Sequence, residues 1–555
     1  MSAAVPSRSL GRASALLASG TIVSRVLGFA RTAVLAAAIG QTASSVADAF
    51  ALSNQLPNNV YALIAGGLLS AVLIPQIVRA SRTPDGGQEY INKIVTLGLV
   101  VFGAVTLIAT IAAPALVDVY ARSASGSTVN GVTGVYGFNE PTHQLAIVFA
   151  YWCLPQIFFY AVYSLLSEIL NARGVFGPFT WAPVLNNVVG VLGLVVFLVA
   201  FGTHNVNPQL LSTTAVVILA GTTTLGVAVQ AGFLLLFWKG AGLTYRPDFR
   251  WRGVGLGATG RAAGWMFALI LVTQLAGVVQ SRTASIGSGV GASNATISNA
   301  WLLFFLPHGI VTVSIATAYF TSMTHHAEQG DIRAVRNNLS ESMRTIGMFI
   351  VFATFALAVL AYPFSRFYET RYFDVTDMAQ VILAYLPGLV FFSMLFLLQR
   401  VFFAFHDQRT VFFLQLIQSG IFVIAVLLCT LFVDPDHIAV AIAIVTSVAG
   451  TTQTIVALRL VHTKLGGLDG RWVTRRHVQY IVFSAVAAVV GLLVVSAMGG
   501  YDPDGFGLSG RIPAILTVIV GGAVMALVYF VLLTLARIPE LSAMTRPVFR
   551  RLRRR

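Results

Sequence analysis

The sequence contains little charge. Only 10% of its 555 residues are Asp, Glu, Lys or Arg, whereas soluble domains carry about 25% charged residues. The charged residues are clustered between long apolar runs, and each run is about as long as a helix that crosses a bilayer. This composition excludes an ordinary soluble domain and predicts an all-α polytopic membrane protein.

Cysteine and reactive side-chain clusters are also scarce. The two cysteines, Cys153 and Cys429, lie in apolar runs, which excludes a disulfide framework and a zinc site. The first apolar segment continues past 20 residues without a small-residue cleavage context, so we expect no cleaved signal peptide. The sequence lacks metal-ligand clusters, a P-loop and a nucleophile constellation. These absences predict a transporter without a cofactor rather than an enzyme, and nucleic acid is not an expected partner.

Fourteen membrane spans are expected from the apolar runs. Their approximate ranges are 13–39, 46–77, 91–117, 144–170, 178–201, 213–238, 262–285, 295–322, 343–363, 379–405, 411–433, 438–461, 478–499 and 512–536. With a cytoplasmic N-terminus, the cytoplasmic segments carry 26 of the 35 Lys and Arg residues, and the outer loops carry only four. This asymmetry obeys the positive-inside rule and predicts that both termini are cytoplasmic.

Related motifs recur six spans apart. The Leu-Pro of YWCLPQIFFYAVYSLLSEIL (151–170) returns in LAYLPGLVFFSMLFLLQRVF (383–402), and two shorter motifs repeat in the same register. We therefore expect two six-helix lobes of equal orientation, at 13–243 and 258–468. The last two spans (473–537) are then an appended pair, followed by a basic cytoplasmic tail (538–555) that rests on anionic lipid headgroups. Such two-lobed proteins usually bind substrate between the lobes and rock, so a transporter is favoured over a channel.

Two arginines interrupt the first span, SRVLGFARTAVLAAAIG (24–40). An arginine at the centre of a membrane helix costs about 2.5–3.5 kcal/mol on insertion scales. Six residues turn a helix by about 600°, so Arg25 and Arg31 point about 120° apart. Both side chains can face the same cavity only if that cavity is wide. Asp48 and Glu168 are the acids expected within the spans. Because guanidinium binds phosphate in a bidentate manner, unpaired arginines predict an anion-binding cavity.

Further polar residues within the spans are candidates for the same cavity. Arg282 of span seven is the expected third cation, and amides are expected to contact the sugar and peptide parts of a substrate. These amides are Asn54, Gln55, Asn58 and Gln280. Asp48 is either a helix-start carboxylate, favoured by the helix dipole, or a counter-ion of the two arginines. Glu168 either pairs with Arg173 or titrates during transport.

The segments SRVLGFAR (24–31) and ADAFALSNQLPN (47–58) closely resemble the MurJ (MviN) family of bacterial lipid II flippases. This family belongs to the multidrug/oligosaccharidyl-lipid/polysaccharide exporter superfamily. By this resemblance Arg25 and Arg31 match the family's essential first-span arginines, and Asp48 matches its second-span aspartate. The resemblance implies lipid II, an undecaprenyl-diphosphate-linked disaccharide pentapeptide, as the substrate. It implies alternating access across the bacterial cytoplasmic membrane, a groove for the lipid tail in 473–537, and membrane lipids and cell-wall synthesis proteins as partners.

The sequence also departs from the family pattern. Basic residues that many members carry after the second-span Leu-Pro-Asn are replaced by Asn59, Val60, Tyr61 and Ala62. The acids that form the family's sodium site in the second lobe are absent from the expected spans. We therefore expect the membrane potential, rather than sodium, to drive transport. Three alternatives stay open: a flippase for another polyprenyl-linked glycan, a cation-coupled multidrug exporter, and a membrane enzyme acting on polyprenyl phosphates.

Overall fold

The computed structural model describes residues 7–68, 87–129, 132–175, 177–250 and 260–542. Within these residues, 13 helices are long and apolar enough to cross a membrane. The second predicted span (46–77) begins in helix α2 (Ser45–Leu68), and its residues 69–77 lie outside the described ranges. The described part also contains one small hairpin, formed by β1 (Ser125–Val129) and β2 (Val132–Tyr136). The prediction of an all-α polytopic membrane protein is confirmed.

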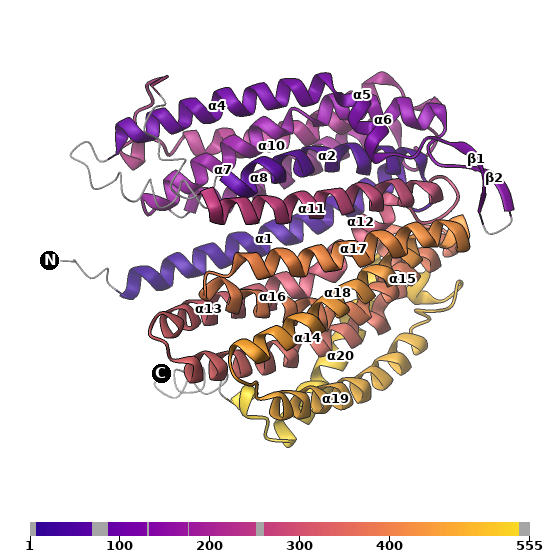
Figure 1. Ribbon diagram of the computed structural model, residues 1–555. Coiled ribbons are helices and arrows are strands. Elements are labelled where there is room, and N and C mark those ends of the chain that lie inside the picture. The colour runs from indigo at the N-terminus through magenta and orange to yellow at the C-terminus, as the bar shows by residue number, and fades with distance from the viewer. Residues whose placement is uncertain (1–6, 69–86, 130–131, 176, 251–259, 543–555) are drawn as a thin grey trace. The chain divides into compact units, whose positions relative to one another are not determined.

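The helices pack as two compact units, of which unit 1 contains residues 1–128 and 133–289 (Figure 1). Its main helices are α1 (Ser7–Ile39), α2 (Ser45–Leu68), α4 (Gln88–Ile111), α5 (Ala113–Tyr120), α6 (Glu140–Cys153), α7 (Gln156–Ala172), α8 (Gly177–Phe201), α9 (Thr213–Val216), α10 (Thr222–Leu235) and α11 (Gly260–Ala284). A π-helical segment, η3 (Val217–Gly221), joins α9 to α10.

Unit 2 contains residues 129–132 and 290–555. Its main helices are α12 (Asn294–Pro307), α13 (Val313–Glu328), α14 (Ile332–Tyr368), α15 (Tyr372–Tyr385), α16 (Leu389–Ala404), α17 (Gln408–Phe432), α18 (Ile438–Lys464), α19 (Gly470–Ala497) and α20 (Arg511–Leu535). Helix α15 begins at Tyr372, so Asp374 and Asp377 lie in its first turns and not in the loop before the tenth predicted span. Asp374 is buried there and forms an ion pair with Arg371.

Each unit contains a long helix that is interrupted at the repeated Leu-Pro dipeptide. In unit 1 the break between α6 and α7 falls at Leu154 and Pro155. In unit 2 the break between α15 and α16 is a 3-10 turn at Leu386–Gly388. Proline removes a backbone donor and crowds the preceding turn, which explains why both helices break at this position.

Helix α11 was expected to open the second lobe (258–468), but it groups with unit 1. It packs along α2, and two contacts hold its C-terminal end. Arg282 donates hydrogen bonds to the carbonyl oxygens of Asp118 and Val119 at the end of α5. Ser288, four residues beyond α11, donates to the Asp48 carboxylate at 2.8 Å.

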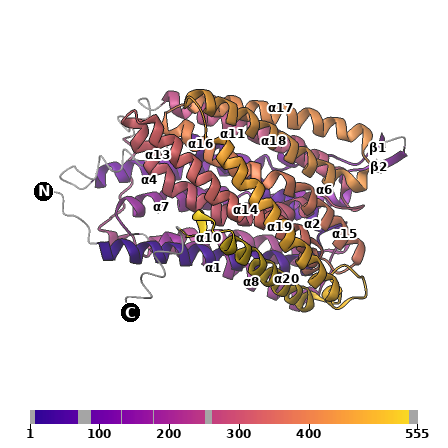
Figure 2. The ribbon, with the colours of Figure 1, turned by 90° about the horizontal axis from the view of Figure 1, so that it is seen from below.

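The last two helices, α19 and α20, pack against α14 within unit 2 (Figures 1 and 2). The buried Tyr529 hydroxyl of α20 donates to the Met348 carbonyl of α14 at 2.6 Å. Glu540, which follows α20, forms an ion pair with Arg344 of α14 at 2.7 Å. The appended pair is therefore an integral part of unit 2's core.

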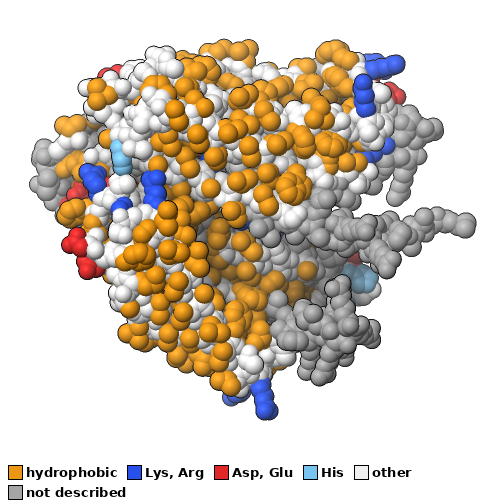
Figure 3. Space-filling model, turned by 180° about the vertical axis from the view of Figure 1, so that it is seen from behind, with side chains coloured by type: hydrophobic (Ala, Val, Ile, Leu, Met, Phe, Trp, Pro, Cys, Tyr) orange, Lys and Arg blue, Asp and Glu red, His pale blue; other side chains and the backbone are white. Residues whose placement is uncertain are grey.

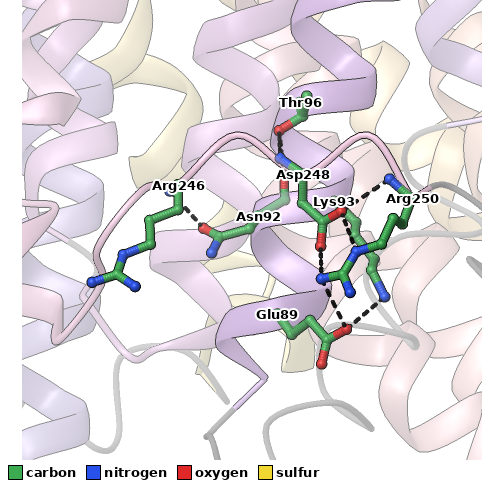
Figure 4. A network of polar contacts seen from close by, with 7 residues as sticks. All are labelled: Glu89, Asn92, Lys93, Thr96, Arg246, Asp248 and Arg250. Atoms are coloured by element: carbon green, nitrogen blue, oxygen red, sulfur yellow. Dashed lines mark hydrogen bonds and ion pairs between the residues drawn. The ribbon is translucent and has the colours of Figure 1, made fainter.

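A segment that follows α10, residues 244–250, is fixed to α4 by a ladder of side chains, of which Figure 4 shows the contacts at Arg246 and Asp248. Gln88, Asn92 and Thr96 are spaced four residues apart on one face of α4. Their side-chain oxygens accept hydrogen bonds from the backbone N–H groups of Thr244, Arg246 and Asp248, at 3.2, 3.3 and 3.0 Å. Four helical residues rise about 6 Å, and two extended residues span about the same distance, so the two repeats match.

Charged side chains flank this ladder. Arg250 pairs with Asp248 at 3.0 Å, and Lys93 pairs with Glu89 at 2.8 Å (Figure 4). The hydrogen bond from the Arg250 side chain lowers the pKa of Asp248. The chain between α10 and α11 is thus held against α4 up to Arg250.

Hydrophobic side chains dominate the surface that faces outward from the helices. Figure 3 shows one face that is covered largely by such side chains, with Lys and Arg near its margins. Exposed examples on the long helices include Val199, Leu493 and Leu535. This distribution is what a bilayer requires of a protein embedded in it.

Candidate functional site

Helix α1 lies against α8 along a seam of glycines and amides. Asn187 of α8 donates a hydrogen bond to the Ser24 carbonyl oxygen at 2.9 Å, and its amide lies 3.6 Å from the position of a Cβ on Gly28. One turn further along, Gly190 faces Arg31. The small residues allow α1 to approach α8 closely, and this close contact fixes the position of the Arg31 backbone.

The Arg31 guanidinium is held by neutral groups. Its Nη1 atom donates to Asn186 Oδ1 at 3.5 Å, and it lies near the Tyr160 hydroxyl and the Cys153 thiol. A Cβ at position 190 would lie 2.6 Å from Arg31 Nε, so a larger residue there would require the Arg31 side chain to shift. Neutral neighbours orient the guanidinium and leave its charge uncompensated.

Asn186 is itself held by a buried relay. Its Nδ2 atom donates to Gln230 Oε1 at 2.8 Å, and the Gln230 side chain lies beside the Tyr163 hydroxyl. Tyr163 in turn donates to the Phe179 carbonyl at 2.8 Å. Because the Asn186 Nδ2 atom is held by Gln230, the oxygen of Asn186 is directed at Arg31.

Arg25 is half-buried on the same helix. Within the described ranges, neither Arg25 nor Arg31 forms an ion pair with a carboxylate, and Arg25 has no hydrogen-bond partner. A buried charge without a partner is costly in an apolar environment. The two cations on α1 are therefore the strongest indication of an anionic ligand in unit 1.

Asp48 lies in the first turn of α2 and is fully buried. It accepts the hydrogen bond from Ser288 described above. This position agrees with the helix-start reading, because a carboxylate in the first turn is stabilised by the helix dipole and by free N–H groups. In this arrangement Asp48 links α2 to the end of α11.

The other predicted residues fall into two groups. Arg282 is exposed, lies near the end of α11 and binds the last carbonyls of α5, so the structure does not bring it into contact with Arg25 or Arg31. Gln280, one turn earlier on α11, is half-buried. The three amides of α2 (Asn54, Gln55 and Asn58) instead lie beside α7 or on the exposed side of α2.

Two polar contacts join these amides to α7. Gln156 Nε2 donates to Asn54 Oδ1 at 3.4 Å, and Asn58 lies beside the Tyr160 hydroxyl. Gln55 and Asn58 are exposed, although both lie inside a span. Exposed amides at this depth indicate that this side of α2 faces water and not lipid.

Three residues of the site were not predicted from the sequence: Tyr160, Tyr163 and Gln230. A signal was present, since Gln156, Tyr160, Ser164 and Glu168 recur every four residues in an otherwise apolar helix. This spacing places them on one face of α7. Gln230 lacked such a signal, because it is a single amide in a helix rich in small and apolar residues.

The chain is similar to known proteins of one family. The family model described as "Lipid II flippase MurJ" matches residues 35–506. A probable lipid II flippase MurJ of Haemophilus influenzae is 27% identical over 409 residues, which cover 70% of this chain and 75% of the relative. A probable lipid II flippase MurJ of Synechocystis is 23% identical over 567 residues, covering 99% of this chain and 98% of the relative.

Solved structures show the same fold. The inward closed conformation of a lipid II flippase MurJ matches with a TM-score of 0.69 and 16% identity, covering 96% of this chain and 99% of that chain. An inward-facing multidrug resistance transporter of the MATE family and the MOP superfamily matches with a TM-score of 0.59 and 15% identity. This match covers 80% of the present chain and 94% of the transporter chain. Because the family model matches residues 35–506, which are most of the chain, the chain belongs to the MurJ family of lipid II flippases.

Proposed function

We propose that this protein moves lipid II from the cytoplasmic to the outer leaflet of the bacterial cytoplasmic membrane by alternating access. The observation that carries this proposal is the pair of α1 cations, Arg25 and Arg31, which have no carboxylate partner among the described residues. A diphosphate supplies the missing negative charge. It also offers several acceptor oxygens to the planar guanidinium groups.

The neutral relay behind Arg31 supports a transport role. Asn186 orients the guanidinium but does not neutralise its positive charge. The anion is therefore bound by electrostatic attraction, and it is released when water enters the cavity again. A carboxylate at this position would form a permanent ion pair and compete with the substrate. We therefore assign diphosphate binding to Arg25 and Arg31, and assign to Arg282 the role of holding α11 against α5.

The polyprenyl tail needs a separate environment, because each CH₂ group favours hydrocarbon over water by about 0.8 kcal/mol. We propose that it lies along α19 and α20, whose outward faces are rich in exposed apolar residues such as Val482, Val489 and Leu527. Cell-wall synthesis proteins that make or consume lipid II are the expected protein partners.

Complementation tests the main proposal. The gene replaces the lipid II flippase of a depleted host, and lipid II at the outer surface is measured by labelling with an impermeant reagent. Arg25→Ala and Arg31→Ala are expected to abolish growth and surface exposure, whereas Arg31→Lys retains part of the activity because ammonium binds phosphate only as a point charge. Arg459→Ala, at an exposed position on α18, is the matched control. Full growth of the Arg25→Ala, Arg31→Ala double variant would contradict the proposal.

The same assay separates lipid II from another polyprenyl-linked glycan. Depletion of a lipid II flippase leaves lipid II inside the cell and blocks cell-wall growth, whereas loss of a different glycan carrier leaves lipid II exposure unchanged. A multidrug exporter would restore drug resistance without restoring lipid II exposure.

Cysteine labelling tests the proposed orientation. Thr203 is exposed in the loop after α8, and Gly240 is exposed in the turn after α10. A cysteine at 203 is expected to react with an impermeant thiol reagent added outside, and one at 240 to be protected. The reverse labelling pattern would place both termini outside.

A further inference from the structure

Helices α2 and α7 share a ladder of polar contacts, here called the α2–α7 track. It consists of Asn54, Asn58 and Tyr61 on α2 and Gln156, Tyr160 and Ser164 on α7. Gln156 Nε2 donates to Asn54 Oδ1 at 3.4 Å and to Thr224 Oγ1 of α10 at 3.0 Å. Asn58 lies beside the Tyr160 hydroxyl, and Ser164 lies beside the Tyr61 hydroxyl. Successive positions on each helix are three or four residues apart, so the contacts form one continuous line between the two helices.

The α2–α7 track has more hydrogen-bonding capacity than its own contacts use. The Gln156 side chain is fully buried, and its Oε1 atom has no hydrogen-bond partner in the described part of the chain. Asn58 is exposed, and Asn54 and Tyr160 are half-buried. A pair of helices that needed only to pack would be cheaper to build from apolar residues at this depth. The unused donors and acceptors therefore point to a polar ligand.

The chemistry of the α2–α7 track selects the kind of ligand. All six of its side chains are neutral, so they offer no charge to a phosphate or a carboxylate. Amides and hydroxyls both donate and accept hydrogen bonds, as sugar hydroxyl and acetamido groups require. The Tyr61 and Tyr160 rings lie side by side, with centroids 6.0 Å apart and an angle of 40° between their planes. Such rings offer apolar faces on which a sugar ring packs.

The α2–α7 track also passes beside the proposed diphosphate site at its middle position on α7. Tyr160 lies near the Arg31 guanidinium, and from position 156 to position 164 the helix rises about 12 Å. In a polyprenyl-diphosphate glycan the first sugar is bonded directly to the diphosphate. A glycan whose diphosphate is bound by Arg31 is therefore delivered to this line of side chains.

We propose that the α2–α7 track is a saccharide-binding subsite, which takes the neutral amino-sugar part of the carried glycan while Arg25 and Arg31 take its diphosphate. The inference rests on the proposed function. It divides recognition between a charged part, which any polyprenyl diphosphate satisfies, and a neutral part, which requires a sugar. A site built to hydrogen-bond substrate hydroxyls discriminates strongly against ligands that lack them.

Binding to the purified full-length protein tests this division, with undecaprenyl diphosphate and the same lipid carrying one or two amino sugars as probes. The wild-type protein is expected to bind the sugar-bearing lipids more tightly than the bare diphosphate. Asn58→Leu and Tyr160→Phe are expected to weaken binding of the sugar-bearing lipids about threefold to tenfold for each lost hydrogen bond. Binding of bare undecaprenyl diphosphate is expected to stay unchanged in Asn58→Leu and to weaken less than binding of the sugar-bearing lipids in Tyr160→Phe, whereas Arg31→Ala weakens the binding of all probes.

Tyr90→Phe is the matched control, because it removes a tyrosine hydroxyl of α4 that has no hydrogen-bond partner in the described part of the chain. Asn58→Ser, a milder change, is measured alongside, so that a folding defect in Asn58→Leu does not decide the result. Unchanged affinity for sugar-bearing lipids in Asn58→Ser and Tyr160→Phe would overturn the inference. Equal losses for bare and sugar-bearing lipids would also overturn it, because the α2–α7 track would then only support Arg31. A wild-type protein that binds no polyprenyl diphosphate would instead refute the proposed function.

Discussion

The side chain of Arg31 occupies the space that any side chain at position 190 would need. A Cβ on Gly190 would lie 2.6 Å from Nε, 2.8 Å from Cζ and 3.0 Å from Cδ of Arg31. Nε and Cζ belong to the guanidinium, Cδ is the methylene group that carries it, and Nη1 of the same side chain donates to Asn186 Oδ1 at 3.5 Å. The glycine in α8 therefore decides where the cation of α1 sits.

Replacing Gly190 by Ala is expected to displace Arg31 and to reduce lipid II transport at least tenfold, while the protein stays folded. Alanine favours the helix over glycine by about 1 kcal/mol, so a loss of activity would not reflect a weaker α8. Transport is measured as surface-exposed lipid II, and thermal unfolding reports stability. Gly232→Ala in α10 is the control, because nothing lies within 4 Å of a Cβ there. Normal transport by Gly190→Ala would show that the position of Arg31 is not critical.

Replacing Asn186 by Asp is expected to place a carboxylate beside Arg31. The resulting internal ion pair occupies the guanidinium and competes with the diphosphate, so affinity for undecaprenyl diphosphate should fall about tenfold or more. Native mass spectrometry or a lipid-binding titration measures this affinity. Asn205→Asp is the control, since Asn205 lies in the loop after α8 and bonds only backbone carbonyls. Unchanged diphosphate affinity in Asn186→Asp would place the anion elsewhere.

Replacing Thr96 by Val is expected to loosen the segment at 244–250. The change keeps the side-chain shape but removes the acceptor of the Asp248 N–H group and the partner of the Tyr245 hydroxyl. One lost hydrogen bond contributes about 1 kcal/mol, so the amides of this segment should exchange with deuterium about fivefold faster. Hydrogen-exchange mass spectrometry measures this rate. Thr106→Val, on the same helix, removes a hydroxyl that has no partner in the described residues, and is expected to leave the exchange unchanged.

Transport is expected to depend on membrane potential. Moving about two negative charges toward an outside-positive face gains about 2.3 kcal/mol per charge per 100 mV if the charges cross the full field. Surface exposure of lipid II is measured while potential, pH gradient and sodium are varied separately. Exposure that persists without a potential but stops when sodium alone is removed would indicate a sodium site. Asp374 and Asp377 at the start of α15 would then be the first acids to replace.

Much of the architecture could be predicted from the sequence. Long apolar runs, the distribution of Lys and Arg, and the repeated Leu-Pro determine the number of helices, their breaks and the type of protein, because each depends on local composition. The two α1 arginines were found for the same reason. A cation in an apolar run is unfavourable wherever the chain folds, so its presence alone predicts a function.

The partners of these residues were decided only by tertiary structure. Asn186 and Gln230 lie 155 and 199 positions beyond Arg31 in the sequence, and α8 and α10 bring them beside it through helix packing. Arg282 is the opposite case. Its sequence suggested a cavity cation, but the end of α5 offers it free carbonyl groups, and α11 packs with unit 1. Whether a polar side chain binds a ligand or a neighbouring helix depends on which unsatisfied groups the fold places within its reach, and local sequence does not contain that information.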